Sequence, residues 1–140
     1  MALGSSSHLD WRRLEVYLGH MPSGTSSWTL AHALENAYDG EFAKFDFKSD
    51  ARNILEYGSV HRPEWSIESI TNQFVALVSA VDDQFFTPRQ VQQLRNRLRV
   101  PLIDDHVILE PGFSHFDFHW GADCGALVNT RIVNILDQFA

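Results

Sequence analysis

The second half of the 140-residue chain predicts an α/β fold, in which parallel strands alternate with helices. A short continuous apolar run, QFVALVSAV at residues 73–81, has the composition of a strand buried on both faces of a parallel sheet. A second apolar run, DDHVILE at residues 104–110, predicts another strand. A helix-like segment follows each strand, and the order strand, helix, strand, helix is typical of a parallel α/β arrangement.

The helix signals are local and well placed. Between the strands, Thr87 is a suitable N-cap and Pro88 suits the first helical position, because proline lacks an N–H that a helix start leaves unpaired anyway. The apolar residues of this segment fall on one face: Val91, Leu94 and Leu98. The second strand ends before Pro111 and Gly112. The terminal amphipathic helix, residues 125–139, has an apolar stripe made of Leu127, Ile132, Ile135 and Leu136.

The first half predicts less regular structure. Ser26 is an N-cap candidate for a helix that ends at Gly40. EFAKFDF at residues 41–47 predicts a strand or an extended loop, and RPEWSIESIT at residues 62–71 predicts a loop followed by a short helical turn. Residues 1–9 are rich in glycine and serine and are expected to be flexible.

Composition excludes several classes of function. Eleven Lys and Arg against eighteen Asp and Glu give a net charge of −7, so nucleic acid would be repelled. A single cysteine, Cys124, excludes an internal disulfide and a cysteine-based zinc site. The sequence has no apolar run near the about 18 residues of a transmembrane helix, and its first residues lack a signal-peptide core.

Candidate catalytic side chains follow the two predicted strands. Asp82 and Asp83 come directly after the first strand, and His115 comes shortly after the second. Sites in open parallel sheets collect beyond the carboxyl ends of the strands, so we expect an aspartate to meet the histidine. A carboxylate that accepts a hydrogen bond from one imidazole nitrogen leaves the other free to move a proton. This is the Asp and His part of a catalytic triad, in the chain order of an α/β-hydrolase.

An alternative is a metal site. His115, Asp117 and His119 alternate in FSHFDFHWGAD, so an extended strand would put two histidines and a carboxylate on one face, a set that binds iron or zinc. The segment follows a Pro-Gly pair and precedes Trp-Gly, which disfavours a strand. We therefore favour the catalytic interpretation of His115.

Several short motifs, in this order, resemble the acid lipases, the gastric and lysosomal lipase family. They are HMPSGTS (20–26), EFAKFDF (41–47), ARNILEYG (51–58), RPEW (62–65), VALVSAVDD (75–83) and HFDFHWGAD (115–123). The pattern H-x-D-F-x-W-G-x-D before a terminal amphipathic helix is the most specific of them. The resemblance implies the C-terminal half of an α/β-hydrolase with an incomplete sheet, residues 10–60 being the region where a cap rejoins the core and residues 70–140 the core.

Carried over position by position, the resemblance implies that His115 is the catalytic histidine and Asp83 its aspartate, with Asp82 as the neighbouring alternative. Asp117 and Trp120 are expected to support the histidine loop, and Cys124 to be a small half-buried residue. The chain departs from the family where Ala80 and Val81 replace a glycine pair and Gln84 replaces a tryptophan.

The largest departure from the family is that the motif of the nucleophilic serine is absent from the sequence. An α/β-hydrolase carries its serine in G-x-S-x-G, and this pentapeptide does not occur in the sequence. We therefore expect a partial hydrolase of neutral lipid esters, such as triacylglycerols and cholesteryl esters, that is inactive alone. No metal or organic cofactor is implied, and the family is secreted or lysosomal. The alternative is a non-catalytic, lipase-derived module that binds lipid or protein.

Overall fold

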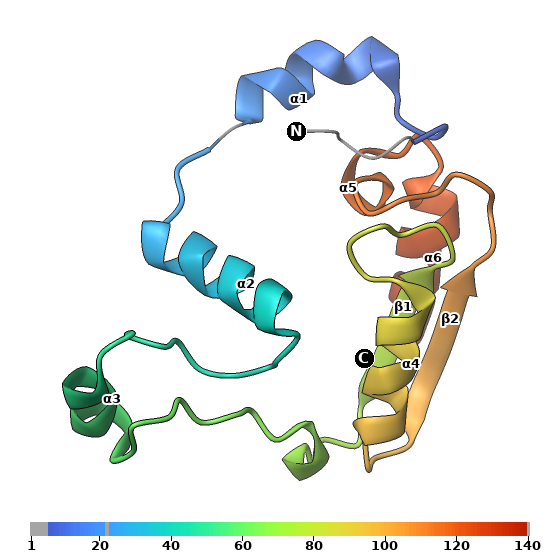
Figure 1. The fold of residues 1–140 in the computed structure, drawn as a ribbon. Helices are drawn as coiled ribbons and strands as arrows, with labels where there is room; N and C mark the ends of the chain where they lie inside the picture. Colours follow the sequence, from blue (N-terminus) through green and yellow to red (C-terminus); the bar gives the residue numbers. More distant parts are fainter. Residues whose placement is uncertain (1–5, 22, 140) are drawn as a thin grey trace. The chain divides into compact units, whose positions relative to one another are not determined.

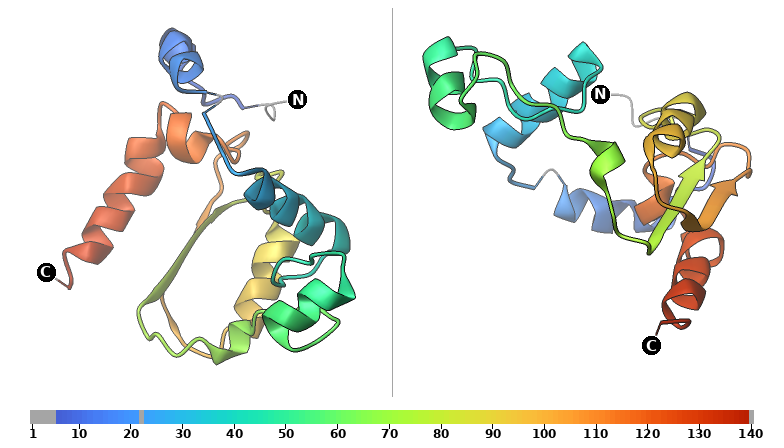
Figure 2. Two further views of the ribbon diagram at one scale, coloured as in Figure 1. Left: turned by 90° about the vertical axis from the view of Figure 1, so that its left-hand side faces the viewer. Right: turned by 90° about the horizontal axis from the view of Figure 1, so that it is seen from below.

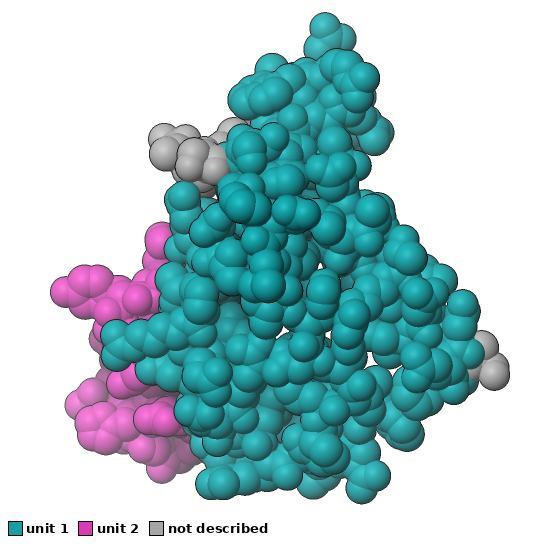
Figure 3. All heavy atoms as spheres, turned by 90° about the vertical axis from the view of Figure 1, so that its right-hand side faces the viewer, with its two compact units in different colours: residues 1–21, 67–140 teal, residues 22–66 magenta. Residues whose placement is uncertain are grey.

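The computed structural model describes residues 6–21 and 23–139. The chain divides into two compact units, and Figure 3 distinguishes them. Unit 1 comprises Met1–Met21 and Ile67–Ala140, and unit 2 comprises Pro22–Ser66. The described part of the chain contains no helix long and apolar enough to cross a membrane.

Unit 1 contains a two-stranded parallel sheet (Figure 1). Strand β1 (Val75–Ala80) pairs with β2 (Leu102–Ile108), and the register runs from Val75 opposite Leu102 to Ala80 opposite Ile108. The two runs predicted as parallel strands are therefore confirmed. Among the described residues no strand pairs with the other edge of β1, so the sheet is incomplete, as expected.

Helix α4 (Pro88–Arg97) connects the strands and starts as the sequence predicts. The Thr87 hydroxyl accepts from the Gln90 amide, and the Gln90 side chain accepts from the Thr87 amide, which completes a capping box. The predicted terminal helix is confirmed as two parts, the π-helical turn η3 (Gly125–Asn129) and α6 (Thr130–Leu136).

Helices α4 and α6 attach to opposite faces of β2. Consecutive strand residues point to opposite faces of a sheet, and Asp104 and Asp105 are consecutive. The guanidinium of Arg131 in α6 binds Asp104, whereas that of Arg95 in α4 binds Asp105. Figure 2 shows one helix on each side of the strands. The core of the unit lies where the strands end and consists of Ala80, Ile108, Phe113, Cys124 and Val128.

The remaining elements of unit 1 are short. They are η1 (Trp11–Arg13), α1 (Leu14–His20), η2 (Ile67–Ser69) and α5 (Asp117–Trp120). The 3-10 turn η2 confirms the short helical turn expected within residues 62–71. Residues 1–5, within the segment expected to be flexible, lie outside the described residues, whereas Ser6 to Leu9 form hydrogen bonds within unit 1.

Unit 2 is built from α2 (Ser27–Asp39) and α3 (Asp50–Tyr57). The Ser26 hydroxyl accepts from the Trp28 amide, and Gly40 ends α2 in the left-handed conformation, as the sequence predicts. Residues 41–47 form an extended loop, in which Ala43 makes an isolated antiparallel bridge with Glu64.

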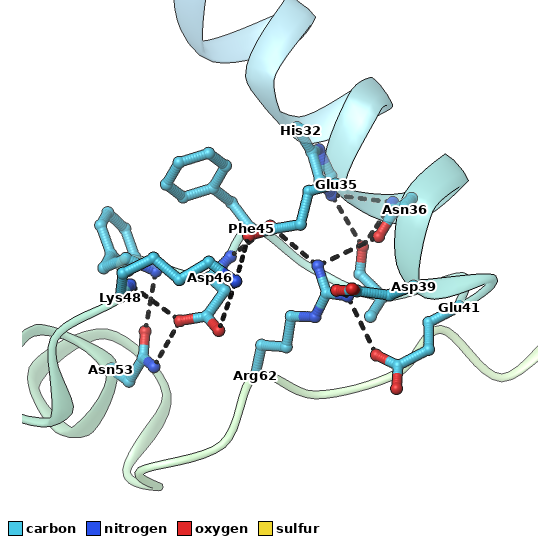
Figure 4. Close-up of polar contacts among 12 residues, drawn as sticks. His32, Glu35, Asn36, Asp39, Glu41, Phe45, Asp46, Lys48, Asn53 and Arg62 are labelled. Atoms are coloured by element: carbon cyan, nitrogen blue, oxygen red, sulfur yellow. Dashed lines mark hydrogen bonds and ion pairs between the residues drawn. The ribbon is translucent and has the colours of Figure 1, made fainter.

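A polar network holds unit 2 together (Figure 4). The side chain of Arg62 is only 7% exposed, and its guanidinium donates to Glu35, Asp39 and Glu41, so a buried cation is neutralised. Asn53 is buried and joins the segments on either side of α3. Its Oδ1 accepts from the Phe47 N–H, and its Nδ2 donates to the Asp46 carboxylate and to the Val60 carbonyl.

Candidate functional site

Asp83 lies three residues beyond the end of β1 and is held rigidly. Its side chain is 5% exposed. The oxygen Oδ1 accepts hydrogen bonds from the backbone N–H groups of Phe85 at 2.8 Å and Phe86 at 2.9 Å. A short turn after the strand therefore points its own amides at the carboxylate and fixes its orientation.

His115 lies in the loop that follows β2 and meets this carboxylate. Nδ1 of His115 is 3.1 Å from Oδ2 of Asp83, and the histidine side chain is 37% exposed. The two strands are parallel neighbours, so both residues follow strand ends at the same edge of the sheet. The contact requires the tautomer, or the imidazolium, that carries a proton on Nδ1, which leaves Nε2 for other chemistry.

Asp82, the neighbouring alternative, has a different partner. Its Oδ2 accepts a hydrogen bond from the Gly112 N–H at 2.7 Å. Gly112 has φ +78°, a conformation that favours glycine, so this carboxylate stabilises a tight turn at the start of the histidine loop. The two adjacent aspartates thus have different hydrogen-bond partners, and of the two only Asp83 contacts His115.

Asp117 is fully buried and organises the same loop. Its Oδ2 accepts from the Ser114 N–H at 2.7 Å and from the Ser114 hydroxyl at 3.2 Å, and its Oδ1 accepts from the Ser6 hydroxyl. Ser114 precedes His115, so the buried carboxylate fixes the backbone that carries the imidazole. This is the geometry expected of a residue that supports the loop.

The segment from His115 to His119 is a turn leading into a helix rather than a strand, because α5 begins at Asp117. The three alternating side chains do not share a strand face, and the carboxylate of Asp117 is already bound by serine donors. Within residues 6–21 and 23–139, no group of three or more His, Cys, Asp or Glu side chains has the spacing of a metal site.

Aromatic rings surround the imidazole of His115. The ring centroids of Phe85, Phe86 and Phe116 lie 5.0, 5.4 and 5.7 Å from that of His115. Phe116 stacks on Trp120 at 5.1 Å, and Trp120 stacks on Tyr17 at 5.2 Å. Trp120 therefore packs behind the histidine loop, where it was expected to support it.

An apolar cavity of about 290 Å³ adjoins the Asp83–His115 pair. Its walls include Leu77 from β1 and Val91 and Leu94 from α4. Asp83 and His115 line the same cavity, next to residues 77–79 of β1. Among the described residues, the outer edge of this strand is unpaired. An apolar group could therefore lie beside the imidazole.

Cys124 does not resemble a nucleophile. It is buried, and its thiol donates to the Phe118 carbonyl at 3.0 Å. Burial raises the pKa of the Cys124 thiol, with a smaller contribution from the negative charge of Asp117. A raised pKa disfavours the thiolate that would react, so the residue packs in the core.

The structure contains a second His–Asp pair, which the sequence does not predict. Nδ1 of His8 is 3.0 Å from Oδ2 of Asp123, and Nε2 of His8 is 3.2 Å from the Pro111 carbonyl oxygen. The hydrogen bond that the His8 ring donates to the Asp123 carboxylate is the largest cause of the raised pKa of His8. A total of 115 residues separate the partners in sequence, and no local pattern predicts such a contact.

Comparison with known proteins gives relatives but no matching family model. Gastric triacylglycerol lipase of Mus musculus is 30% identical over 131 residues, which are 94% of this chain and 32% of that protein. Lipase member N of Homo sapiens is 24% identical over 136 residues, 97% of this chain and 33% of that protein. The lysosomal acid lipase/cholesteryl ester hydrolase of Homo sapiens is 24% identical over 132 residues, 94% of this chain and 32% of that protein. The chain spans about a third of the length of these relatives.

Proposed function

We propose that this chain, which belongs to the gastric and lysosomal acid lipase family, supplies the histidine and aspartate of a Ser-His-Asp triad that hydrolyses neutral lipid esters. His115 is the general base and acid, and Asp83 orients it. The serine nucleophile comes from a polypeptide segment outside these 140 residues, since no G-x-S-x-G occurs among them.

The contact between Nδ1 of His115 and Oδ2 of Asp83 carries this proposal. The carboxylate fixes the Nδ1–H tautomer, so Nε2 can take a proton from a serine hydroxyl and return it to the leaving alcohol. Among the described residues no hydrogen bond is made to Nε2 of His115, and the side chain is more than a third exposed to solvent. The imidazole is therefore available to an incoming hydroxyl.

The class of substrate rests on the relatives and on the surroundings of the pair. The relatives include a triacylglycerol lipase and a cholesteryl ester hydrolase. Three phenylalanine rings and an apolar cavity border the imidazole, surroundings that suit a long acyl chain better than a charged substrate. By the same kinship we propose a secreted or lysosomal location.

A chimera tests the proposal. In the gastric triacylglycerol lipase of mouse, the segment that this chain matches would be replaced by the chain itself, and hydrolysis of a triacylglycerol emulsion would be measured. We expect hydrolysis by the chimera and none by the isolated chain, because removing the nucleophile from a triad removes most of the rate.

Two variants of the chimera sharpen the result. His115→Gln removes the base and should lower the rate about a thousandfold or more. His61→Gln changes an exposed histidine of unit 2 and should leave the rate within about threefold, because it changes no part of the pair or of the lining of the adjoining cavity. A folded chimera that hydrolyses nothing, or one that tolerates His115→Gln, would refute the proposed role.

The alternative function is a non-catalytic module that binds lipid or protein. It is favoured by large apolar side chains that are exposed in unit 1, among them Phe74 at 66%, Leu136 at 62% and Phe139 at 54%. Binding of the isolated chain to neutral-lipid droplets, unchanged by His115→Gln and accompanied by an inactive chimera, would favour this alternative.

A further inference from the structure

The N-terminal segment from Ser6 to Asp10, called here the strap, lies along the histidine loop, Pro111 to Asp123. The backbone N–H of Ala122 donates to the His8 carbonyl at 2.8 Å, and Leu9 forms an antiparallel bridge with Gly121. The hydroxyl of Ser6 donates to Asp117 in the middle of the loop. The Ser7 hydroxyl donates to the Pro111 carbonyl at 3.3 Å, so the strap contacts the loop on both sides of His115.

The side chain of His8 joins the two ends of the loop. Nε2 lies 3.2 Å from the carbonyl oxygen of Pro111, the first loop residue, and Nδ1 lies 3.0 Å from the carboxylate of Asp123, the last. The ring also packs edge-on against Phe113, with centroids 5.5 Å apart. The His8 side chain is 16% exposed, whereas that of Asp123 is 61% exposed, so the bridge lies at the edge of the protein surface.

Both ring nitrogens of His8 face hydrogen-bond acceptors. A neutral imidazole has one N–H and can satisfy only one acceptor, whereas an imidazolium donates to both. The charged form is thus the form that fits. The Asp123 hydrogen bond raises the pKa of His8 most, the Pro111 carbonyl and the nearby Asp117 charge raise it further, and burial lowers it.

Other charged groups around His8 are already engaged. On the loop, Asp117 is bound by Ser6 and Ser114. On the strap, Asp10 accepts from the Arg12 guanidinium at 3.0 Å. Asp123 is 61% exposed and is the carboxylate in direct contact with the His8 ring.

We propose that His8, in its protonated form, is a positioning residue for His115: by bridging Asp123 and Pro111 it fastens both ends of the histidine loop and holds the loop more firmly at acidic than at alkaline pH. This inference rests on the proposed function, because it assigns His8 a role through the Asp83–His115 pair. His8 itself acts only through the loop.

The sign of the pH dependence follows from the raised pKa. The unfolded reference for histidine is 6.5, and the folded value is higher. The stabilisation is therefore fully present below 6.5 and is lost as the pH rises through the folded pKa. The loop should loosen as the pH rises through the folded pKa of His8.

Amide hydrogen exchange of the full chain, expressed as protection factors at about pH 5.5 and about pH 8.5, tests the inference. The reporters are the Ser114 amide, which donates to Asp117, and the Ala122 amide, which donates to His8. We expect protection of both to fall about fivefold at the higher pH, the factor for one charge-assisted hydrogen bond at a part-exposed site.

His8→Phe keeps an aromatic ring against Phe113 but has no N–H, so protection should be low and nearly equal at both pH values. The through-space NMR contacts of the His115 ring with Phe85 and Phe86 should weaken with pH in the unmodified chain and lose that pH dependence in the variant. His61→Phe, at an exposed histidine of unit 2, is the matched control and should keep the pH dependence.

A milder variant covers the case in which His8→Phe fails to fold. Asp123→Asn keeps an acceptor oxygen and removes the charge, so the loss of protection should begin at a lower pH. Equal protection at both pH values in the unmodified chain, or an unchanged pH dependence in Asp123→Asn, would overturn the inference. Neither measurement needs ester hydrolysis, so failure of the chimera would be a separate result.

Discussion

Nδ1 of His115 lies 3.1 Å from Oδ2 of Asp83, and the second oxygen of that carboxylate accepts hydrogen bonds from the amides of Phe85 and Phe86. The turn after β1 thus fixes the carboxylate, and the carboxylate fixes the imidazole. Ala80 and Val81, at the positions where the resemblance to the acid lipases implies a glycine pair, do not prevent this contact. Alanine at position 80 is instead part of the core.

Asp83→Asn in the chimera should lower ester hydrolysis about 10³–10⁴-fold, because an amide can donate to Nδ1 and favour the wrong tautomer. Asp82→Asn is the matched control and should cost less than about tenfold, since Asp82 binds the Gly112 amide and not the histidine. Initial rates on a soluble short-chain ester would separate the two. Equal losses would contradict the assignment of Asp83 over Asp82.

The sequence predicted the parts of the fold that depend on neighbouring residues. Apolar runs located both strands, and Thr87 and Ser26 located helix starts, because capping and strand composition are local properties. Helix α3 was not predicted, and its N-cap, Ser49, makes no side-chain capping bond. That helix is held instead by the buried amide of Asn53, whose partners lie outside it.

Some residues of the candidate site could likewise be predicted from the sequence, and others could not. Asp83 and His115 could be found because each follows a strand, and parallel neighbours end at one edge of a sheet. The residues that bind the histidine loop from the N-terminal segment could not be predicted. Ser6 and His8 come from a segment rich in serine and glycine, and their contacts with Asp117 and Asp123 depend on tertiary packing across more than a hundred residues.

Asp117→Ala should destabilise unit 1 by about 2–3 kcal/mol, because it leaves the buried Ser114 N–H without its acceptor. Chemical denaturation followed by tryptophan fluorescence would measure the change in the free energy of unfolding. Asp137→Ala, at an exposed aspartate after α6, should change it by less than about 0.5 kcal/mol. A change below 1 kcal/mol for Asp117→Ala, on the same estimate, would show that the carboxylate does not support the loop.

Gly112→Ala should destabilise the chain by about 1–2 kcal/mol. Gly112 has φ +78°, and an added Cβ would meet the Ser7 hydroxyl of the strap. Gly19→Ala, inside α1 with nothing within 4 Å of the added Cβ, should instead stabilise by about 0.5–1 kcal/mol. Thermal unfolding of both variants would measure the two opposite shifts, and a neutral Gly112→Ala would contradict the tight turn.

The carboxyl of Asp46 should make unit 2 sensitive to strong acid. The hydrogen bond from Asn53, followed by those from the Lys48 backbone and ammonium, lowers the pKa of Asp46 from 3.8 to about 2. A lowered pKa gives stability that is fully present above 3.8 and is lost as the pH falls through about 2. We expect this term to be about 1–2 kcal/mol after solvent screening.

NMR titration of the side-chain carboxyl carbons would measure this pKa directly, and Asn53→Ala should move it back toward 3.8 because the variant lacks the largest cause of the shift. Asp46→Asn should destabilise unit 2 near neutral pH and have little effect near pH 2, where the carboxyl of the unmodified chain is half protonated. Gln92→Ala, on the exposed face of α4 in unit 1, is the matched control and should not move the titration. An Asp46 carboxyl that titrates near 3.8 in the unmodified chain would show that the Asn53 hydrogen bond does not hold the loop before α3.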